Sequence, residues 1–146
     1  MAGEKVASIL FVCGQNAVRS PMARALAEEL FPGRFYTASA GVIAGERDPF
    51  VDAALAEVGL DIGDHRPAAL EDLDDQNFDL VITLSPQAHH RALELTRTRA
   101  IEVEYWPMPD PTDTIGAREQ ILAAYRDLRE RLAGRLRERL GALSPP

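Results

Sequence analysis

Cysteine is almost missing from this sequence, since Cys13 is the only one among 146 residues. A single cysteine excludes an intramolecular disulfide and is typical of a reducing compartment, so we expect a cytoplasmic protein. Long hydrophobic runs are missing too. No stretch approaches the roughly 18 apolar residues of a membrane span, and the N-terminal segment lacks the pattern of a signal peptide. These absences argue against a secreted protein and against a membrane protein.

Basic residues are in the minority, with 16 Lys and Arg against 23 Asp and Glu, which gives a formal net charge of −7. Such a balance argues against a nucleic-acid or anionic-membrane partner, because either needs a basic face. Histidine is also scarce. His89 and His90 are adjacent, so on a helix they point about 100° apart, and no cysteine or carboxylate spacing completes a metal site. We therefore expect no metal and no cofactor.

The remaining composition is that of an ordinary globular protein, with 46% hydrophobic and 27% charged residues. A chain of this length predicts one domain over residues 1–146, with fraying at 1–4 and 141–146. The sequence leaves the oligomeric state open.

Strand and helix patterns alternate along the chain. Four short apolar runs predict buried strands: 6–12, 34–40, 78–84 and 101–106. Four periodic segments predict helices, and a fifth, polar segment predicts a short one: 20–31, 49–58, 86–96, 116–140 and 70–75. This alternation predicts an α/β fold, an open four-stranded parallel sheet with helices on both faces.

Helix boundaries and loops are marked by proline and capping residues. Ser20 is predicted to cap the first helix, with Pro21 at its first position, and Asp48 opens the second helix. Residues 107–114, PMPDPTDT, contain three prolines and are predicted to be loop. His65 is predicted to be a surface or capping residue. Trp106 and its neighbour Tyr105 either line the edge of a site or end a strand.

One segment, FVCGQNAVRSPMARA at residues 11–25, carries a chemical signature. The five residues between Cys13 and Arg19 join a strand to a helix. So short a loop can curl until its backbone N–H groups and the helix dipole bind a tetrahedral oxyanion. Gly14 and Asn16 both tolerate the left-handed backbone angles that a curled loop can use.

The residues around this loop favour nucleophilic chemistry. Arg19 offers a planar fork that grips two oxygens of the anion. The same positive field favours the thiolate of Cys13, and Ser20 is placed to hydrogen-bond the sulfur. The structural alternative is that Cys13 is simply a small buried hydrophobic residue.

A general acid is predicted on the proline-rich loop. Carboxyl ends of parallel strands meet at one edge of a sheet, so Cys13 after the first strand and Asp110 after the fourth can lie close together. Asp110 could protonate a departing oxygen. Asp113 is a weaker candidate for this role, and a plain turn residue is the alternative for Asp110.

These segments resemble the low-molecular-weight protein tyrosine phosphatases, over almost the whole chain. The loop matches the family pattern C-x5-R-[ST], and three further segments are similar to it: SAGVIAGERDP at 39–49, FDLVITLS at 78–85 and WPMPDPTD at 106–113. The resemblance implies a cytoplasmic hydrolase with Cys13 as nucleophile, Arg19 as transition-state anchor and Asp110 as general acid and then base.

The resemblance also assigns the rest of the loop. It implies that Asn16 holds the shape of the loop, that Ser20 stabilises the thiolate, and that Gly14, Gln15, Ala17 and Val18 complete the substrate-binding loop. The implied substrate is a phosphorylated protein or a small phosphate ester, hydrolysed through a phosphocysteine.

Two positions depart from many family phosphatases and keep alternatives open. Val18 stands where they carry a second cysteine, and Thr112 stands where they tend to carry an aromatic ring. The thioredoxin-coupled arsenate reductases share the fold and loop, but they need two further cysteines, one near Ser85. A reductase that uses an external small thiol needs only Cys13 and is the second hypothesis. The third is an oxyanion-binding module without turnover.

Overall fold

A computed structural model describes residues 5–75 and 77–143 of the chain. Four strands form one sheet in the order β2-β1-β3-β4, and all neighbouring pairs are parallel: β1 (Ser8–Cys13), β2 (Tyr36–Gly41), β3 (Leu80–Thr83) and β4 (Glu102–Tyr105). The helices are α1 (Arg19–Leu30), α2 (Pro49–Ala56), α3 (Pro86–Leu93) and α4 (Arg118–Gly141). The predicted single α/β sheet is therefore confirmed.

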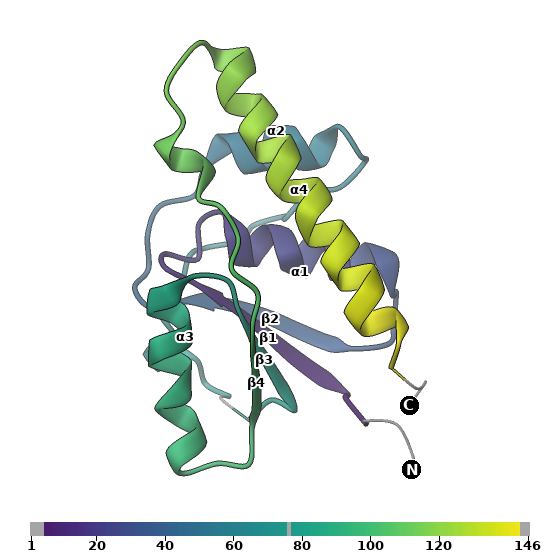
Figure 1. The fold of residues 1–146 in the computed structure, drawn as a ribbon, viewed down its shortest axis with the longest axis vertical. Coiled ribbons are helices and arrows are strands. Elements are labelled where there is room, and N and C mark those ends of the chain that lie inside the picture. The colour runs from purple at the N-terminus through teal and green to yellow at the C-terminus, as the bar shows by residue number, and fades with distance from the viewer. Residues whose placement is uncertain (1–4, 76, 144–146) are drawn as a thin grey trace.

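The two faces of the sheet are covered unequally. Side chains of a strand alternate between faces, and β1 divides accordingly. Ile9, Phe11 and Cys13 pack in the core shared with α1, α2 and α4, whereas Leu10 and Val12 pack in the core shared with α3. Figure 1 shows the corresponding layers, with the long α4 crossing α1 on one side of the sheet and α3 on the other. Helices thus lie on both faces, as predicted.

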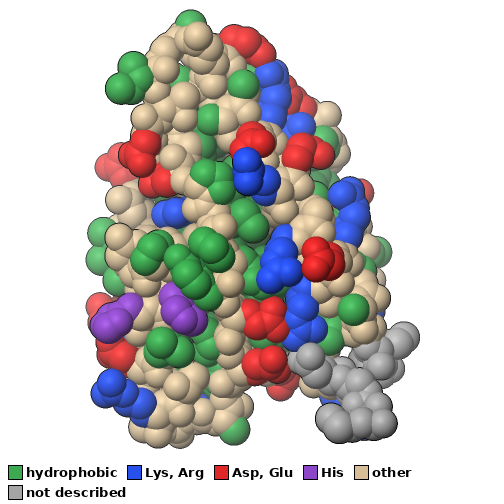
Figure 2. Space-filling model, in the orientation of Figure 1, with side chains coloured by type: hydrophobic (Ala, Val, Ile, Leu, Met, Phe, Trp, Pro, Cys, Tyr) green, Lys and Arg blue, Asp and Glu red, His purple; other side chains and the backbone are tan. Residues whose placement is uncertain are grey.

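The C-terminal helix follows its predicted apolar stripe. Ile121 packs partly buried beside six buried residues of this stripe: Leu122, Tyr125, Leu128, Leu132, Leu136 and Leu140. Acidic and basic side chains alternate over its outer side (Figure 2). Arg126 and Arg129 both bond Glu57 just past α2, and these hydrogen bonds lower the pKa of Glu57 to about 2. This ion-pair cluster joins α2 to α4.

Several predicted boundaries were wrong for identifiable reasons. The polar segment 70–75 holds only a 3-10 turn at Leu70–Asp72, and another, Pro111–Asp113, interrupts the predicted loop at 107–114. Helix α3 ends at Leu93 and a 3-10 turn follows it. At the C-terminus, α4 reaches Gly141 and Leu143 is buried, while residues 144–146 and 1–4 lie outside the described residues, so fraying of the two ends stays a prediction.

Two further features bear on the sequence predictions. Trp106 is buried in the core directly after β4, where its ring nitrogen donates to Glu104, so it belongs to the core at the end of this strand. Among the helices at residues 5–75 and 77–143, none has the length and apolar character that crossing a membrane requires.

Candidate active site

The loop between β1 and α1 lies at the carboxyl edge of the sheet, where Cys13 is the last residue of β1. Within the described chain, no hydrogen bond uses the backbone N–H groups of residues 14–18 as donors. Because three of these residues, Asn16, Ala17 and Val18, are buried, their N–H groups need an acceptor from outside the chain. A tetrahedral oxyanion bound in the loop would supply it.

Asn16 holds this loop by contacts with distant segments. It is fully buried and has a left-handed φ of 55°, so of the two residues that tolerate this conformation Asn16 adopts it and Gly14 does not. Its Nδ2 donates to Ser20 Oγ at 2.8 Å and to Ser39 Oγ at 3.0 Å, and its Oδ1 accepts from the N–H of Ala68 at 3.0 Å. One side chain therefore ties the loop to α1, to β2 and to the segment after residue 60.

Ser20 serves the thiol and not the helix. Its predicted role as N-cap was wrong, because α1 begins at Arg19 after Val18 and has no side-chain cap. Its Oγ lies 3.0 Å from Cys13 Sγ and donates to the carbonyl of Ala40 at 3.2 Å. The hydroxyl has a single hydrogen, so it stabilises a thiolate by hydrogen bonding only when that hydrogen turns from the Ala40 carbonyl to the sulfur. The cysteine itself is buried and free.

His65 was missed by the sequence reasoning. Its Nε2 lies 2.9 Å from the carbonyl oxygen of Asn16, so this imidazole nitrogen must carry the proton and donate it. His65 is half-buried, and the prediction of a surface or capping residue did not include this contact with the loop. The two residues are 49 positions apart, and no local pattern links them. They come together because the segment around Ala68 lies beside the end of β2. There the N–H of Gly41 donates a hydrogen bond to the carbonyl of Ala68.

Arg19 and Asp110 face each other across the same edge. The two charged groups approach to 3.9 Å between Arg19 Nη2 and Asp110 Oδ2. Arg19 Nη1 also donates to the carbonyl of Met108 at 3.2 Å, which anchors the guanidinium to the loop that carries the acid. The arginine side chain is 14% exposed and that of Asp110 is 38% exposed, so the carboxyl group lies nearer to solvent.

A cavity of about 660 Å³ joins these residues. Its floor includes Cys13 and residues of the loop, and Asp110 and Thr112 line it as well. Val42 and Ile43, in the segment after β2, form part of its wall. No aromatic side chain is among the described residues that line the cavity.

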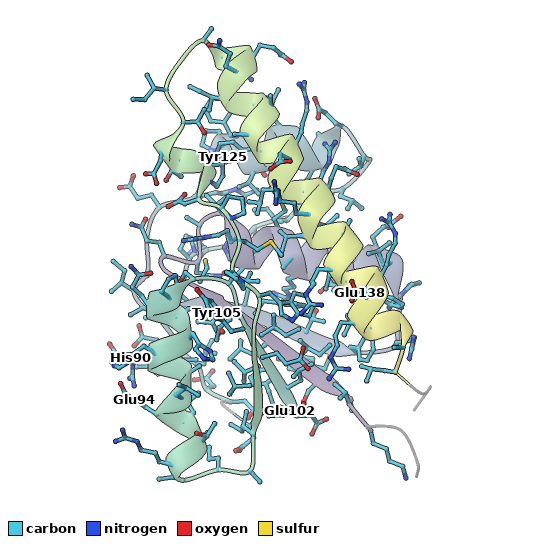
Figure 3. All side chains as sticks on the ribbon, in the orientation of Figure 1. His90, Glu94, Glu102, Tyr105, Tyr125 and Glu138 are labelled. Atoms are coloured by element: carbon cyan, nitrogen blue, oxygen red, sulfur yellow. The ribbon has the colours of Figure 1, made fainter. Side chains whose placement is uncertain are left out.

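A second carboxylate of the cavity wall is fixed in place. Asp48 caps α2 as predicted, accepting from the N–H of Phe50 at 2.9 Å, and its other oxygen accepts from the hydroxyl of Tyr125 at 2.5 Å. Burial raises the pKa of Tyr125, and the bond to Asp48 and the charge of Asp110 raise it further. Figure 3 shows Tyr125 on the side of α4 towards the loop that carries Asp110.

The adjacent histidines lie away from this cavity. His89 Nδ1 lies 3.0 Å from Thr83 Oγ1 and its ring stacks on Tyr105, whereas His90 is exposed on the outer side of α3 (Figure 3). In the part of the chain that the structure describes, no cluster of three or more His, Cys, Asp and Glu side chains is placed to hold a metal ion.

The close approach of β2 to the loop gives a testable expectation. A Cβ added at Gly41 would lie 2.6 Å from the backbone nitrogen of Asn16 and 2.7 Å from the backbone carbon of Gln15. We expect Gly41→Ala to displace the loop and to lower kcat/KM for any oxyanion substrate by about 100-fold, the cost of misplacing reacting groups by about 1 Å. Steady-state kinetics would measure it.

A matched control exists in α4. A Cβ added at Gly134 meets no atom within 4 Å, so Gly134→Ala should leave kcat/KM unchanged. An unchanged kcat/KM in Gly41→Ala would mean that the shape of the loop does not depend on this contact.

Comparisons with known proteins identify the family of the chain. The sequence model of the family described as "Low molecular weight phosphotyrosine protein phosphatase" matches residues 8–143. An arsenate reductase of Bacillus subtilis is 30% identical over 130 residues, which are 89% of this chain and 92% of that protein. A glutaredoxin arsenate reductase of Synechocystis is 26% identical over 136 residues, 93% of this chain and 98% of that protein.

A solved structure shows the same fold. The low molecular weight protein tyrosine phosphatase from T. tengcongensis superposes with a TM-score of 0.78 at 25% identity, covering 94% of this chain and 99% of its own. Relatives with this one fold are thus named for two different activities, arsenate reductase and protein tyrosine phosphatase.

Proposed function

Because the chain belongs to the low molecular weight phosphotyrosine protein phosphatase family, we propose that it is a cysteine-dependent phosphatase that hydrolyses phosphate monoesters through a phosphocysteine. The observation that carries the proposal is the placement of Asp110 opposite Arg19 in the cavity that Cys13 also lines. Binding an oxyanion needs only the loop and the arginine. A carboxyl group in the same cavity can also donate a proton to the leaving oxygen, and cleavage of a phosphate ester needs that proton.

The first chemical step forms the intermediate. The N–H groups of the loop and the guanidinium of Arg19 bind the phosphoryl oxygens, whose charge they stabilise in the transition state. The Cys13 sulfur attacks phosphorus from the floor of the cavity, and the bond from phosphorus to the ester oxygen breaks. Asp110 gives its proton to that oxygen, which leaves as an alcohol or phenol.

The second step releases phosphate. Asp110, now a carboxylate, accepts a proton from a water molecule that attacks the phosphocysteine. The bond between phosphorus and sulfur breaks, and the hydroxyl of Ser20, 3.0 Å from Sγ, stabilises the departing thiolate. Phosphate then leaves, and the protonation states return to those at the start.

The walls bear on the substrate class. The described lining combines aliphatic Val42 and Ile43 with Thr112 and contains no ring that could stack on a phenol. We infer that recognition rests on the phosphoryl group and that the leaving group is selected weakly. Phosphorylated proteins and small phosphate esters are both substrates on this proposal.

Arsenate reduction is the second candidate, favoured by the names of the curated relatives. Cys13 would attack arsenate and displace one of its hydroxyl groups, which leaves as water. An external thiol would then attack the Cys13 sulfur, so that the sulfur–arsenic bond breaks, arsenic leaves reduced as arsenite, and a mixed disulfide remains. A second external thiol would restore Cys13. The chain contains no other cysteine, so an electron relay within it is excluded.

A substrate panel separates the candidates. The purified protein is assayed for phosphate release from 4-nitrophenyl phosphate, phenyl phosphate, an alkyl phosphate and a phosphotyrosine peptide. Arsenite formation is assayed in parallel with glutathione, glutaredoxin or thioredoxin as reductant. We expect phosphate release and no arsenite. Arsenite without phosphate release would assign the reductase, and phosphate binding without either product would assign the binding module.

A further inference from the structure

We propose that Thr112 is a positioning residue that holds the carboxyl group of Asp110 with Oδ2 presented to the leaving group. This inference rests on the proposed phosphatase function. Thr112 donates two hydrogen bonds to one oxygen of Asp110: its hydroxyl lies 2.6 Å from Oδ1 and its backbone N–H lies 3.0 Å from Oδ1. The other oxygen, Oδ2, is the one that lies 3.9 Å from Arg19 Nη2.

The two oxygens of Asp110 are therefore chemically different. A backbone N–H can only donate, and the threonine hydroxyl donates to an ionised carboxylate. Two donor hydrogens already point at Oδ1, so an acid proton on that oxygen would be repelled by them. The proton consequently resides on Oδ2, the oxygen beside the arginine that binds the phosphoryl group. Thr112 thereby sets both the orientation of the acid and the oxygen from which the proton leaves.

Backbone geometry alone does not give this orientation. Asp110 begins the 3-10 turn Pro111–Asp113, and the bond from the Thr112 N–H belongs to that turn. With that single hydrogen bond, Oδ1 is held but the carboxyl group can still turn around it, so the position of Oδ2 is not fixed. The second donor, the side-chain hydroxyl, restricts this rotation, and only serine or threonine at position 112 could supply it from this place.

Thr112 also lines the cavity, so the orienting side chain and the wall beside the leaving group are the same residue. An aromatic ring at this position, as many relatives are expected to carry, would widen the contact with a phenol but would remove the hydroxyl. The chain therefore has a fixed acid in place of an aromatic wall. A fixed acid matters most for esters of alcohols and unsubstituted phenols, whose leaving oxygens need the proton.

The test compares Thr112→Val, Thr112→Ser and the control Thr114→Val, whose hydroxyl makes no hydrogen bond with the described residues. Each is assayed on phenyl phosphate and on 2,4-dinitrophenyl phosphate, whose leaving group needs no proton. We expect Thr112→Val to lower kcat on phenyl phosphate by about tenfold, the scale of one lost hydrogen bond to a charged group, with KM unchanged. On the dinitrophenyl ester the loss should be under about twofold, and Thr112→Ser should restore the wild-type rate on both.

A double substitution gives a second readout. In an Asp110→Asn background, Thr112→Val should have no further effect on kcat, because the group it positions is no longer an acid. An equal loss on both esters, or a loss that persists in the Asp110→Asn background, would overturn the inference and leave Thr112 as a wall residue. If the wild-type protein hydrolysed neither ester, the proposed function would fail and this inference with it.

Discussion

Replacing Cys13 by serine is expected to lower the rate of phosphate ester hydrolysis by at least about 10⁴-fold, while phosphate still binds. The serine hydroxyl is smaller than the thiol and fits the buried place 3.0 Å from Ser20 Oγ. It does not ionise near neutral pH, so the nucleophile is lost. The groups that bind the anion, the loop N–H groups and Arg19, are untouched. Steady-state kinetics and calorimetric titration with phosphate measure the two quantities separately.

Two controls make the result specific. Arg19→Lys keeps the thiol and the positive charge but loses the planar fork, so it should weaken phosphate binding as well as the rate. Thermal unfolding of both variants checks that the fold survives. A Cys13→Ser protein that continued to hydrolyse aryl phosphates would exclude the phosphocysteine mechanism.

Asp110→Asn is expected to slow hydrolysis by roughly 10²- to 10⁴-fold on phenyl and alkyl phosphates, because these leaving groups need a proton. The loss should be small on 4-nitrophenyl phosphate, whose leaving oxygen is a weak base. The amide can still accept hydrogen bonds from Thr112 through its oxygen, so the loop should keep its shape. The measurement is kcat for a series of aryl phosphates plotted against the basicity of the leaving group.

Asp113→Asn is the matched control, since both carboxylates lie on the same short segment. Asp113 is exposed, and no contact places it opposite Arg19, whereas Asp110 is 3.9 Å away. We expect the Asp113→Asn variant to behave as the wild type. A loss in Asp113→Asn with the leaving-group dependence described for Asp110 would transfer the role of general acid to Asp113.

The layers of the fold were accessible from sequence because each rests on a local pattern. The apolar run that ends at Cys13, the stripe of α4 and the Asp48-Pro49 start of α2 each depend on residues close together in the chain. The candidate site was accessible in the same way where it is contiguous, as in the loop from Cys13 to Arg19. Asp110 was accessible because parallel strands bring their carboxyl ends to one edge.

The contacts that support the site were not accessible, because they join distant segments. Ser20 looked like a helix cap, since serine before proline commonly is one, but the nearby thiol and the amide of Asn16 compete for its hydroxyl. His65 meets Asn16 only after β1 and β2 have paired and the segment at Ala68 has come to lie beside Gly41. At the sequence level, Thr112 is distinguished only because it replaces an aromatic residue. The two hydrogen bonds that Thr112 donates to Asp110 could not be predicted from the sequence.

The buried side chain of Asn16 makes the oxyanion loop part of the cooperative folding unit of the domain. Most binding loops open locally at little cost in free energy, because they make few contacts with the rest of the protein. This loop cannot open alone, since freeing Asn16 would break bonds to Ser20, Ser39 and the N–H of Ala68 at once. Opening this loop therefore costs more free energy than opening a loop held only at its ends, and an anion bound there would stabilise the folded domain by mass action.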